Sequence, residues 1–294
     1  MKKIDKEKIK TWFVTGASSG VGYEMCKQLL KRGYNVIAVS RRIPDFKETN
    51  ALCLSVDVTK LETIKNAIKK GIEKFGKIDV LVNNAGISAG VVFEEETLEH
   101  MQEVMSINYF GTYNTMREFI PYFRKHKNGT IINNTSMHGL SFRYGGSAYC
   151  SSKYAIEGLT SVVWHETKNF CRVMTFELGW FPGTDIGTHL NKITNIEEYK
   201  NIKGFYKNFY YSFINQLDIG VKYIIDEVEK EKIQRRLILG KDAIIKIDAE
   251  INYLRKNWKQ SKRRALNCAK FDKEFPKKVI KKIAKIVLKK QLNI

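Results

Sequence analysis

Two groups of residues in this chain have the types and spacing that chemistry requires. The first contains Tyr149 and Lys153, four positions apart, with Ser136 thirteen positions before the tyrosine. Residues at i and i+4 of a helix share a face, so both side chains can reach one bound molecule. A free tyrosine has a pKa of about 10, which a neighbouring ammonium lowers by stabilising the phenolate. Tyr149 can then exchange a proton with an alcohol or carbonyl oxygen, to which Ser136 can donate a hydrogen bond.

The second group is a glycine-rich run, Thr15-Gly16-Ala17-Ser18-Ser19-Gly20-Val21-Gly22. It follows an apolar run and precedes a segment of helical period. Glycine permits a tight turn and lets backbone N–H groups approach a pyrophosphate, and the N-terminus of the next helix adds partial positive charge. The run therefore predicts a dinucleotide site, although taken alone it could be an ordinary turn between a strand and a helix.

The elements that would position these groups follow an alternating pattern through about the first 245 residues. Short apolar, β-branched runs alternate with longer runs of helical period, which predicts a doubly wound α/β domain with a parallel seven-stranded sheet. We expect strands at Thr11–Thr15, Asn35–Ser40, Leu52–Val56, Asp79–Val82, Thr130–Thr135, Arg172–Glu177 and Arg236–Leu239. We expect helices at about Gly20–Arg32, Lys60–Phe75, Leu98–Phe123, Ala148–Phe170 and Asn215–Glu229.

The order of the motifs resembles the short-chain dehydrogenase/reductase family of the classical type. The matching motifs are T-G-x-x-x-G-x-G from Thr15, Asp57-Val58-Thr59, Asn83-Asn84-Ala85-Gly86, Asn108, Ser136 and Tyr149-x-x-x-Lys153. The resemblance implies a Rossmann-type catalytic domain over residues 1–248 and a homo-oligomer, either a dimer or a tetramer. It implies that the catalytic residues are Asn108, Ser136, Tyr149 and Lys153.

The resemblance also implies a set of cofactor contacts. Asp57 would contact the adenine, Asn84 to Gly86 would line the adenosine side, and Asn108 would hold a water that links Lys153 to solvent. The full set implied is Thr15, Gly16, Ser18, Ser19, Gly20, Val21, Gly22, Asp57, Val58, Asn84, Ala85, Gly86, Tyr149 and Lys153.

The end of the second expected strand predicts which dinucleotide binds. An acid there would hydrogen-bond a ribose hydroxyl of NAD, whereas a cation would bind the extra phosphate of NADP. The strand ends in Ser40-Arg41-Arg42, without an acid. Because the guanidinium fork suits a phosphate, we expect NADP(H), with Arg41 as the principal contact and Arg42 as the second. The alternative is a solvated arginine pair.

One segment departs from the family pattern. The family's Pro-Gly would fall at Leu178-Gly179, but this chain has Pro182-Gly183 instead. We expect Thr184, or alternatively Thr188, to be the threonine that contacts the nicotinamide. Residues 179–213 would form a substrate lid.

The lid segment is rich in aromatic side chains from Tyr199 to Phe213, which favours a lipophilic ketone or secondary alcohol, such as a steroid, a retinoid-like or terpenoid alcohol, or a lipid intermediate. Core packing or a dimer contact would explain the same cluster equally well.

Taken together, the motifs predict an NADP(H)-dependent oxidoreductase. A non-catalytic, membrane-associated NADP-binding protein on the same fold is the alternative. A dehydratase or epimerase of the extended family ranks last, because its T-G-x-x-G-x-x-G spacing is absent.

The composition bears on the location of the protein and on metal binding. Of the 294 residues 43% are hydrophobic, but none of the apolar runs reaches the roughly 18 residues needed to cross a bilayer. The charged N-terminus lacks the pattern of a signal peptide, so we expect a cytoplasmic protein. The five scattered cysteines predict free thiols, and neither they nor the five histidines have the spacing of a metal site.

The net charge of +20 is concentrated in the C-terminal extension, residues 249–294. Residues 251–294 contain fifteen Lys or Arg against Asp272 and Glu274, which gives 15 − 2 = +13. Lys277 to Leu292 can form a basic amphipathic helix, which is typical of peripheral membrane contact, or a helix docked on its own domain. Nucleic acid binding is disfavoured, since no recognised binding motif accompanies the charge.

Overall fold

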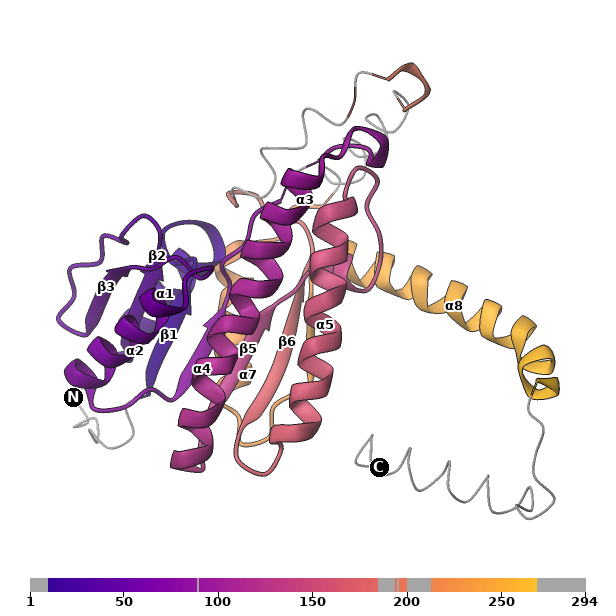
Figure 1. Ribbon diagram of the computed structural model, residues 1–294. Helices are drawn as coiled ribbons and strands as arrows, with labels where there is room; N and C mark the ends of the chain where they lie inside the picture. The colour runs from indigo at the N-terminus through magenta and orange to yellow at the C-terminus, as the bar shows by residue number, and fades with distance from the viewer. Residues whose placement is uncertain (1–9, 89, 185–193, 195, 200–212, 269–294) are drawn as a thin grey trace, which may run out of the picture. The chain divides into compact units, whose positions relative to one another are not determined.

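The central element is a sheet of seven parallel strands in the order β3-β2-β1-β4-β5-β6-β7 (Figure 1). The computed structural model describes residues 10–88, 90–184, 194, 196–199 and 213–268. Its strands are β1 Thr11–Thr15, β2 Asn35–Ser40, β3 Ala51–Ser55, β4 Val80–Asn83, β5 Thr130–Asn134, β6 Arg172–Leu178 and β7 Arg236–Leu239. The strand order reverses between β1 and β4, which is where ligands bind in open α/β sheets.

Helices cover both faces of the sheet. The described α-helices are α1 Gly20–Lys31, α2 Leu61–Phe75, α3 Leu98–Met105, α4 Gly111–His126, α5 Ser147–Thr167, α7 Leu217–Glu229 and α8 Lys241–Asn267, of which α1, α2, α4, α5 and α7 pack on the sheet. One hydrophobic cluster joins α1 and α7 to the sheet, and a second joins α2, α4 and α5 to its opposite face. Figure 1 shows α4 and α5 side by side along the sheet.

Strand β1 explains why this arrangement is stable. All five of its residues are buried, because alternate side chains enter the two cores. Trp12 belongs to the cluster of α1 and α7, whereas Phe13 packs edge-on against Phe119 of α4, with ring centroids 5.1 Å apart. A central parallel strand buried on both faces requires such a continuous apolar run.

The expected seven-stranded parallel sheet is confirmed, with differences in detail. Element ends differ from the expected ones by at most three residues. The single helix expected over Leu98–Phe123 runs without a break to His126, but a π-helical segment, η3 Ser106–Phe110, lies inside it between α3 and α4. Its i→i+5 hydrogen bonds leave no distinct hydrophobic period in the sequence.

The chain divides into two compact units, residues 1–247 and 248–294. In the second unit the described residues continue α8, with Ile251, Leu254 and Trp258 exposed. The expected amphipathic helix over Lys277 to Leu292 lies outside the described residues. Among the helices that the structure describes, none is long and apolar enough to cross a membrane.

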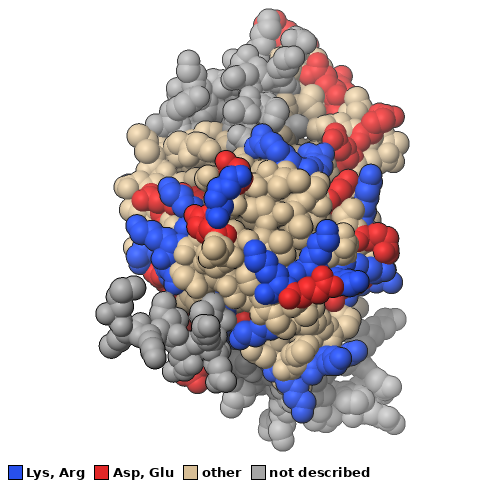
Figure 2. Space-filling view, turned by 90° about the vertical axis from the view of Figure 1, so that its left-hand side faces the viewer, with Lys and Arg blue, Asp and Glu red and all other residues tan. Residues whose placement is uncertain are grey.

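The charges of the first unit are mixed over the face that Figure 2 shows, where Lys and Arg alternate with Asp and Glu. In the same unit, Arg32 forms ion pairs of 2.8 Å with both Asp226 and Glu229 of α7. The mixed charge does not form a continuous basic stripe on this face.

Candidate active site

A cavity of about 380 Å³ lies where β1, β2 and β4 end. Its walls come from the loops that follow these strands and from the start of α1. The lining residues are Gly16, Ser18, Ser19, Gly20, Val21, Ser40, Arg41, Arg42, Val56, Asp57, Val58, Asn84, Ala85, Gly86, Ile87, Ser88, Ile107, Asn134 and Thr184. The cavity therefore contains most of the cofactor contacts predicted from the sequence.

The glycine-rich loop needs its glycines for conformation and for space. Gly16 and Gly20 have φ values of +65° and +54°, in the left-handed region that favours glycine. A Cβ on Gly16 would lie 2.8 Å from the Cα of Ala85. The loop leads directly into the N-terminus of α1 at Gly20, which presents backbone N–H groups to the cavity. This cradle fits the pyrophosphate of a dinucleotide.

Four predicted cofactor contacts lie outside this lining, and two of them, Thr15 and Gly22, belong to the glycine-rich loop. Neither Thr15 nor Gly22 belongs to the cavity wall formed by the described residues. The Thr15 hydroxyl donates to the carbonyl of Val82 and accepts from the N–H groups of Asn84 and Ala85, at 3.2, 2.9 and 3.0 Å. A Cβ on Gly22 would lie 2.3 Å from the carbonyl oxygen of Gly16. Both residues therefore stabilise the conformation of the glycine-rich loop.

The far end of the cavity contains the two arginines after β2. Arg42 Nη2 donates to the carbonyl of Ser18 at 3.1 Å, and the Ser55 hydroxyl donates to the carbonyl of Arg41 at 3.0 Å. Asp57 accepts from the N–H and the hydroxyl of Thr59, at 3.0 and 2.7 Å. Burial opposes ionisation of Asp57, but these hydrogen bonds outweigh it and lower its pKa. Asp57 therefore stays a carboxylate at this wall.

A second, smaller cavity of about 60 Å³ adjoins the first. It is lined by Val21, Asn134, Thr135, Ser136, Met137, His138, Arg143, Tyr149, Leu178, Gly179, Trp180, Phe181 and Thr184. Val21, Asn134 and Thr184 line both cavities. The Thr184 hydroxyl donates to the carbonyl of Phe181 at 2.9 Å, which closes the turn at Pro182-Gly183. Thr188 and most of the expected lid lie outside the described residues.

The structure brings Ser136, Tyr149 and Lys153 together beside the second cavity. Ser136 follows β5 and caps the short 3-10 helix η4, Met137–Gly139, where its Oγ accepts from the N–H of His138 at 3.1 Å. Tyr149 and Lys153 occupy successive turns of α5 and are 5% and 3% exposed. Lys153 Nζ lies 5.6 Å from the centroid of the Tyr149 ring. Tyr149 and Lys153 thus lie on one face of α5, as their spacing of four residues predicts.

Burial shifts the pKa of both Tyr149 and Lys153. It raises the pKa of Tyr149, while a hydrogen bond with Ser136 and the charge of Arg143 act in the opposite direction. It lowers the pKa of Lys153 to about 8, against the charge of Glu157. The phenol therefore binds its proton more firmly, and the ammonium less firmly, than in water.

Lys153 lines neither cavity but lies directly behind the first one. Its Nζ donates to the carbonyl of Asn134 at 2.8 Å. A Cβ on Gly86 would lie 3.8 Å from this nitrogen and 3.1 Å from Asn108 Oδ1. Glycine at position 86 thus keeps the wall thin between the cavity and these two side chains.

Asn108 is fully buried within the π-helical segment η3. Its Oδ1 accepts from the N–H of Ile87 at 2.8 Å, and its Nδ2 donates to the carbonyl of Ile87 and to Ser152 Oγ, at 2.9 and 3.0 Å. The side chain thus joins the loop after β4 to α5. The role expected for Asn108, holding a water that links Lys153 to solvent, stays a prediction.

Sequence reasoning missed Arg143. This buried side chain lines the second cavity, and its Cζ lies 5.1 Å from the centroid of the Tyr149 ring. Its Nη2 donates to Ser88 Oγ at 3.1 Å. Arginine in an irregular loop has no periodicity that would indicate burial, so the sequence contains no signal for this contact. His138 also lines the cavity, and burial lowers its pKa well below the ordinary value, which keeps it neutral.

Within the described ranges, no group of three or more His, Cys, Asp or Glu side chains could hold a metal ion.

Comparisons with known proteins agree with this geometry. The chain is 34% identical over 211 residues to the 3-ketodihydrosphingosine reductase of Bacteroides thetaiotaomicron, covering 70% of this chain and 74% of that protein. It is 33% identical over 184 residues to mouse dehydrogenase/reductase SDR family member 7, and the match spans 58% of this chain and only 51% of that protein.

A solved short-chain dehydrogenase from Streptomyces avermitilis has a similar fold. Its TM-score is 0.80 at 26% identity, covering 90% of this chain and 99% of that one. The family model described as short chain dehydrogenase matches residues 10–194, which include the glycine loop, Ser136, Tyr149 and Lys153. With this match over more than half of its length, the chain belongs to the short-chain dehydrogenase family.

Proposed function

We propose that this oxidoreductase interconverts a ketone and a secondary alcohol with NADP(H), with Tyr149 as the general acid and base. The family uses a nicotinamide dinucleotide, NAD(H) or NADP(H). The observation that carries the proposal is the meeting of Ser136, Tyr149 and Lys153: the first two line the second cavity, and Lys153 lies behind the wall of the first. The first cavity suits the dinucleotide and the second suits the substrate.

The side chains have separate roles in this reaction. When bound, the dinucleotide supplies or accepts the hydride. In reduction, Tyr149 Oη gives its proton to the carbonyl oxygen while Ser136 Oγ stabilises the negative charge that develops there. Lys153 favours the phenolate that remains on Tyr149. Gly16, Gly20 and the N-terminus of α1 would hold the pyrophosphate, and Thr184 would lie toward the nicotinamide.

The choice of NADP(H) over NAD(H) rests on Arg41 and Arg42. Both are exposed at the cavity wall after β2, where the sequence has no acid that would repel a phosphate. A guanidinium can bind a phosphate through two parallel hydrogen bonds. Arg42 already contacts the glycine loop through Ser18, so Arg41 is the better placed of the two to meet the extra phosphate.

A lipophilic ketone is the proposed substrate class. Apolar side chains form much of the second cavity, with Met137, Leu178 and Phe181 among them. The Bacteroides relative is named for a 3-ketodihydrosphingosine, a long-chain ketone, which supports the same class for this chain. Long-chain ketones of the sphingoid and acyl types are the first compounds to assay.

Tyr149→Phe tests the enzymatic function. We expect the full chain to consume NADPH with at least one compound from a panel of lipophilic ketones, and the variant to lose about 10²- to 10⁴-fold in kcat. NADPH binding should remain, because the phenol ring is retained. Equal residual rates for the two proteins would instead favour a non-catalytic NADP-binding protein.

The basic extension and the assembly state need their own measurements. We propose that the extension binds the anionic surface of a membrane peripherally and that the chain is a cytoplasmic homo-oligomer, a dimer or tetramer. Support for membrane binding comes from exposed Ile251, Leu254 and Trp258 on α8, with Lys262 Nζ 5.0 Å from the centre of the Trp258 ring. Sedimentation with anionic vesicles, for the full chain and for one ending at Ala249, tests the membrane contact, and light scattering tests the assembly.

A further inference from the structure

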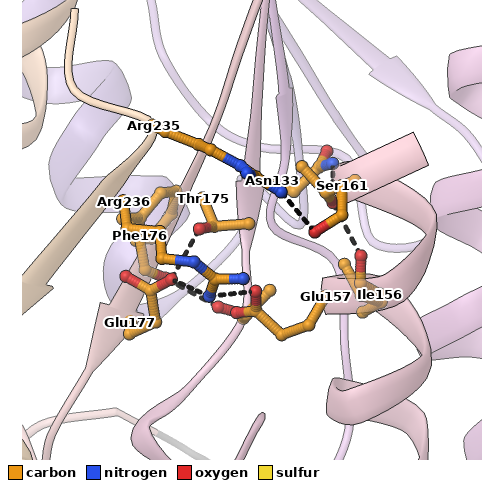
Figure 3. Close-up of polar contacts among 11 residues, drawn as sticks. Asn133, Ile156, Glu157, Ser161, Thr175, Phe176, Glu177, Arg235 and Arg236 are labelled. Carbon is orange, nitrogen blue, oxygen red and sulfur yellow. Dashed lines mark hydrogen bonds and ion pairs between the residues drawn. The ribbon is translucent and has the colours of Figure 1, made fainter. Parts of the chain in front are cut away.

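Two buried glutamates share one arginine at the side of α5, as Figure 3 shows. Glu157 belongs to α5, Glu177 to β6 and Arg236 to β7, and the two acids are 5% and 0% exposed. Arg236 Nη1 donates to Glu157 Oε2 and, at 3.2 Å, to Glu177 Oε1. The Thr175 hydroxyl donates to the same Glu177 oxygen at 2.5 Å.

Each glutamate has one carboxylate oxygen bound to Arg236 and one that is not. In the part of the chain that the structure describes, Glu157 Oε1 and Glu177 Oε2 are buried without a hydrogen-bond partner. Burial, followed by the charge of Glu157, raises the pKa of Glu177, so Glu177 binds a proton more firmly than a carboxyl group in water does.

Glu157 also lies next to the catalytic groups. It is one helical turn after Lys153, on the same face of α5. A Cβ on Gly139, in the short helix that Ser136 caps, would lie 3.2 Å from Glu157 Cγ and 3.2 Å from the carbonyl oxygen of Lys153. The Glu157 side chain therefore packs against the turn that holds Ser136.

We propose that Glu157 is a positioning residue of the active site, whose carboxylate, oriented by Arg236, keeps the amine of Lys153 protonated. Burial of Lys153 acts against its ammonium form, and Glu157 supplies an opposing negative charge. The inference rests on the proposed function, because the ammonium matters only if Tyr149 exchanges a proton with a substrate.

Several other charged or titratable groups face this region. Tyr149 lies on the same helix, and Arg143 contacts the Tyr149 ring from the preceding loop. Arg235, directly before β7, donates to Ser161 Oγ at 2.7 Å and lies over the Trp164 ring at 5.0 Å, and its charge also acts on Glu157. The carboxylate whose charge opposes the burial of Lys153 is that of Glu157.

The cluster also ties α5 to β6 and β7, so the test must separate charge from structure. Glu157→Gln and Glu177→Gln are matched variants: each keeps the shape of one buried acid and a group that can bond Arg236. Activity of the full chain, as kcat/KM for reduction of a ketone with saturating NADPH, would be measured across pH for both variants and the wild type.

The two variants should differ in their pH profiles. In Glu157→Gln the decline of activity at high pH should begin at lower pH by about half a pH unit or more, because Lys153 loses its proton sooner. In Glu177→Gln the decline should stay at the wild-type pH, since the Glu157 carboxylate remains. A profile that is unmoved in Glu157→Gln, or equally moved in both, would overturn the inference.

If Glu157→Gln does not fold, Glu157→Asp takes its place. It keeps the charge but shortens the side chain, so the wild-type pH profile with a lower melting temperature is expected, and a displaced profile would contradict a role through charge. Failure of the role proposed for Glu157 can be distinguished from failure of the proposed function. Activity that survives Tyr149→Phe ends the proposed function, whereas an unmoved profile with inactive Tyr149→Phe ends only the role of Glu157.

Discussion

The amine of Lys153 donates a hydrogen bond of 2.8 Å to the backbone carbonyl of Asn134, the last residue of β5. The bond joins the helix that holds Tyr149 to the strand that leads to Ser136. The relative position of these groups is therefore fixed by the fold itself. In the same geometry the lysine amine is buried behind Gly86, which lines the first cavity.

Lys153→Met should remove catalysis while the protein stays folded. Without the ammonium, the phenolate of Tyr149 loses its stabilising charge, and we expect a loss in kcat of about 10²- to 10⁴-fold for reduction. Steady-state rates with NADPH, together with a melting curve, measure the effect. A variant that melts like the wild type and keeps its rate would show that this lysine has no part in the reaction.

Gly22→Ala should weaken both folding and cofactor binding. Its Cβ would lie 2.3 Å from the carbonyl oxygen of Gly16, so the glycine loop has to move. We expect a loss in the free energy of unfolding of about 1–3 kcal/mol and weaker NADPH binding by fluorescence titration. Gly158→Ala is the control, because an added Cβ on this exposed residue of α5 meets nothing within 4 Å. That change should stabilise the protein by roughly 0.5–1 kcal/mol.

Arg41→Gln should change the preference between the two dinucleotides. The lost guanidinium would weaken NADPH binding by about tenfold or more and leave NADH binding nearly unchanged, because NADH lacks the extra phosphate. Dissociation constants for both dinucleotides measure this ratio. Arg117→Gln, at an exposed position of α4, is the matched control. An unchanged ratio in Arg41→Gln would mean that the arginine is merely solvated.

Stability should fall as the pH rises through neutrality, because of Glu177. Burial and the charge of Glu157 raise its pKa from 4.5 to about 7. A group whose pKa is higher in the folded state stabilises the fold fully below the lower value, and this contribution is lost as pH rises toward the higher value. Glu177→Gln should remove this loss, on the order of 1 to 3 kcal/mol between pH 5 and 8. Denaturant unfolding at both pH values measures it, with Glu166→Gln on the exposed face of α5 as control.

The fold was predictable where residue type and burial agree. The middle of the run Thr11–Thr15 is apolar because β1 is covered on both faces, and Tyr149 and Lys153 share a face because their spacing matches a helical turn. These patterns depend on residues that are close together in the sequence, and the structure has the strand and the helix that they predict.

The remaining features depend on contacts between distant segments. Thr15 looked like a cofactor contact, but its hydroxyl is used by the loop after β4. Glu157 and Glu177 look like ordinary solvated acids in the sequence, since only the packing of α5 on β6 brings them together. The π-helical segment around Asn108 has no periodicity of its own.

Thr184, Val21 and Asn134 belong to the walls of both cavities. A molecule in one cavity therefore changes the surface that the other presents, and the two binding equilibria are linked. Such linkage is reciprocal: whatever factor the dinucleotide contributes to the affinity for the ketone, the ketone contributes to the affinity for the dinucleotide. Substitution of Thr184 should consequently change the dissociation constants of both reactants.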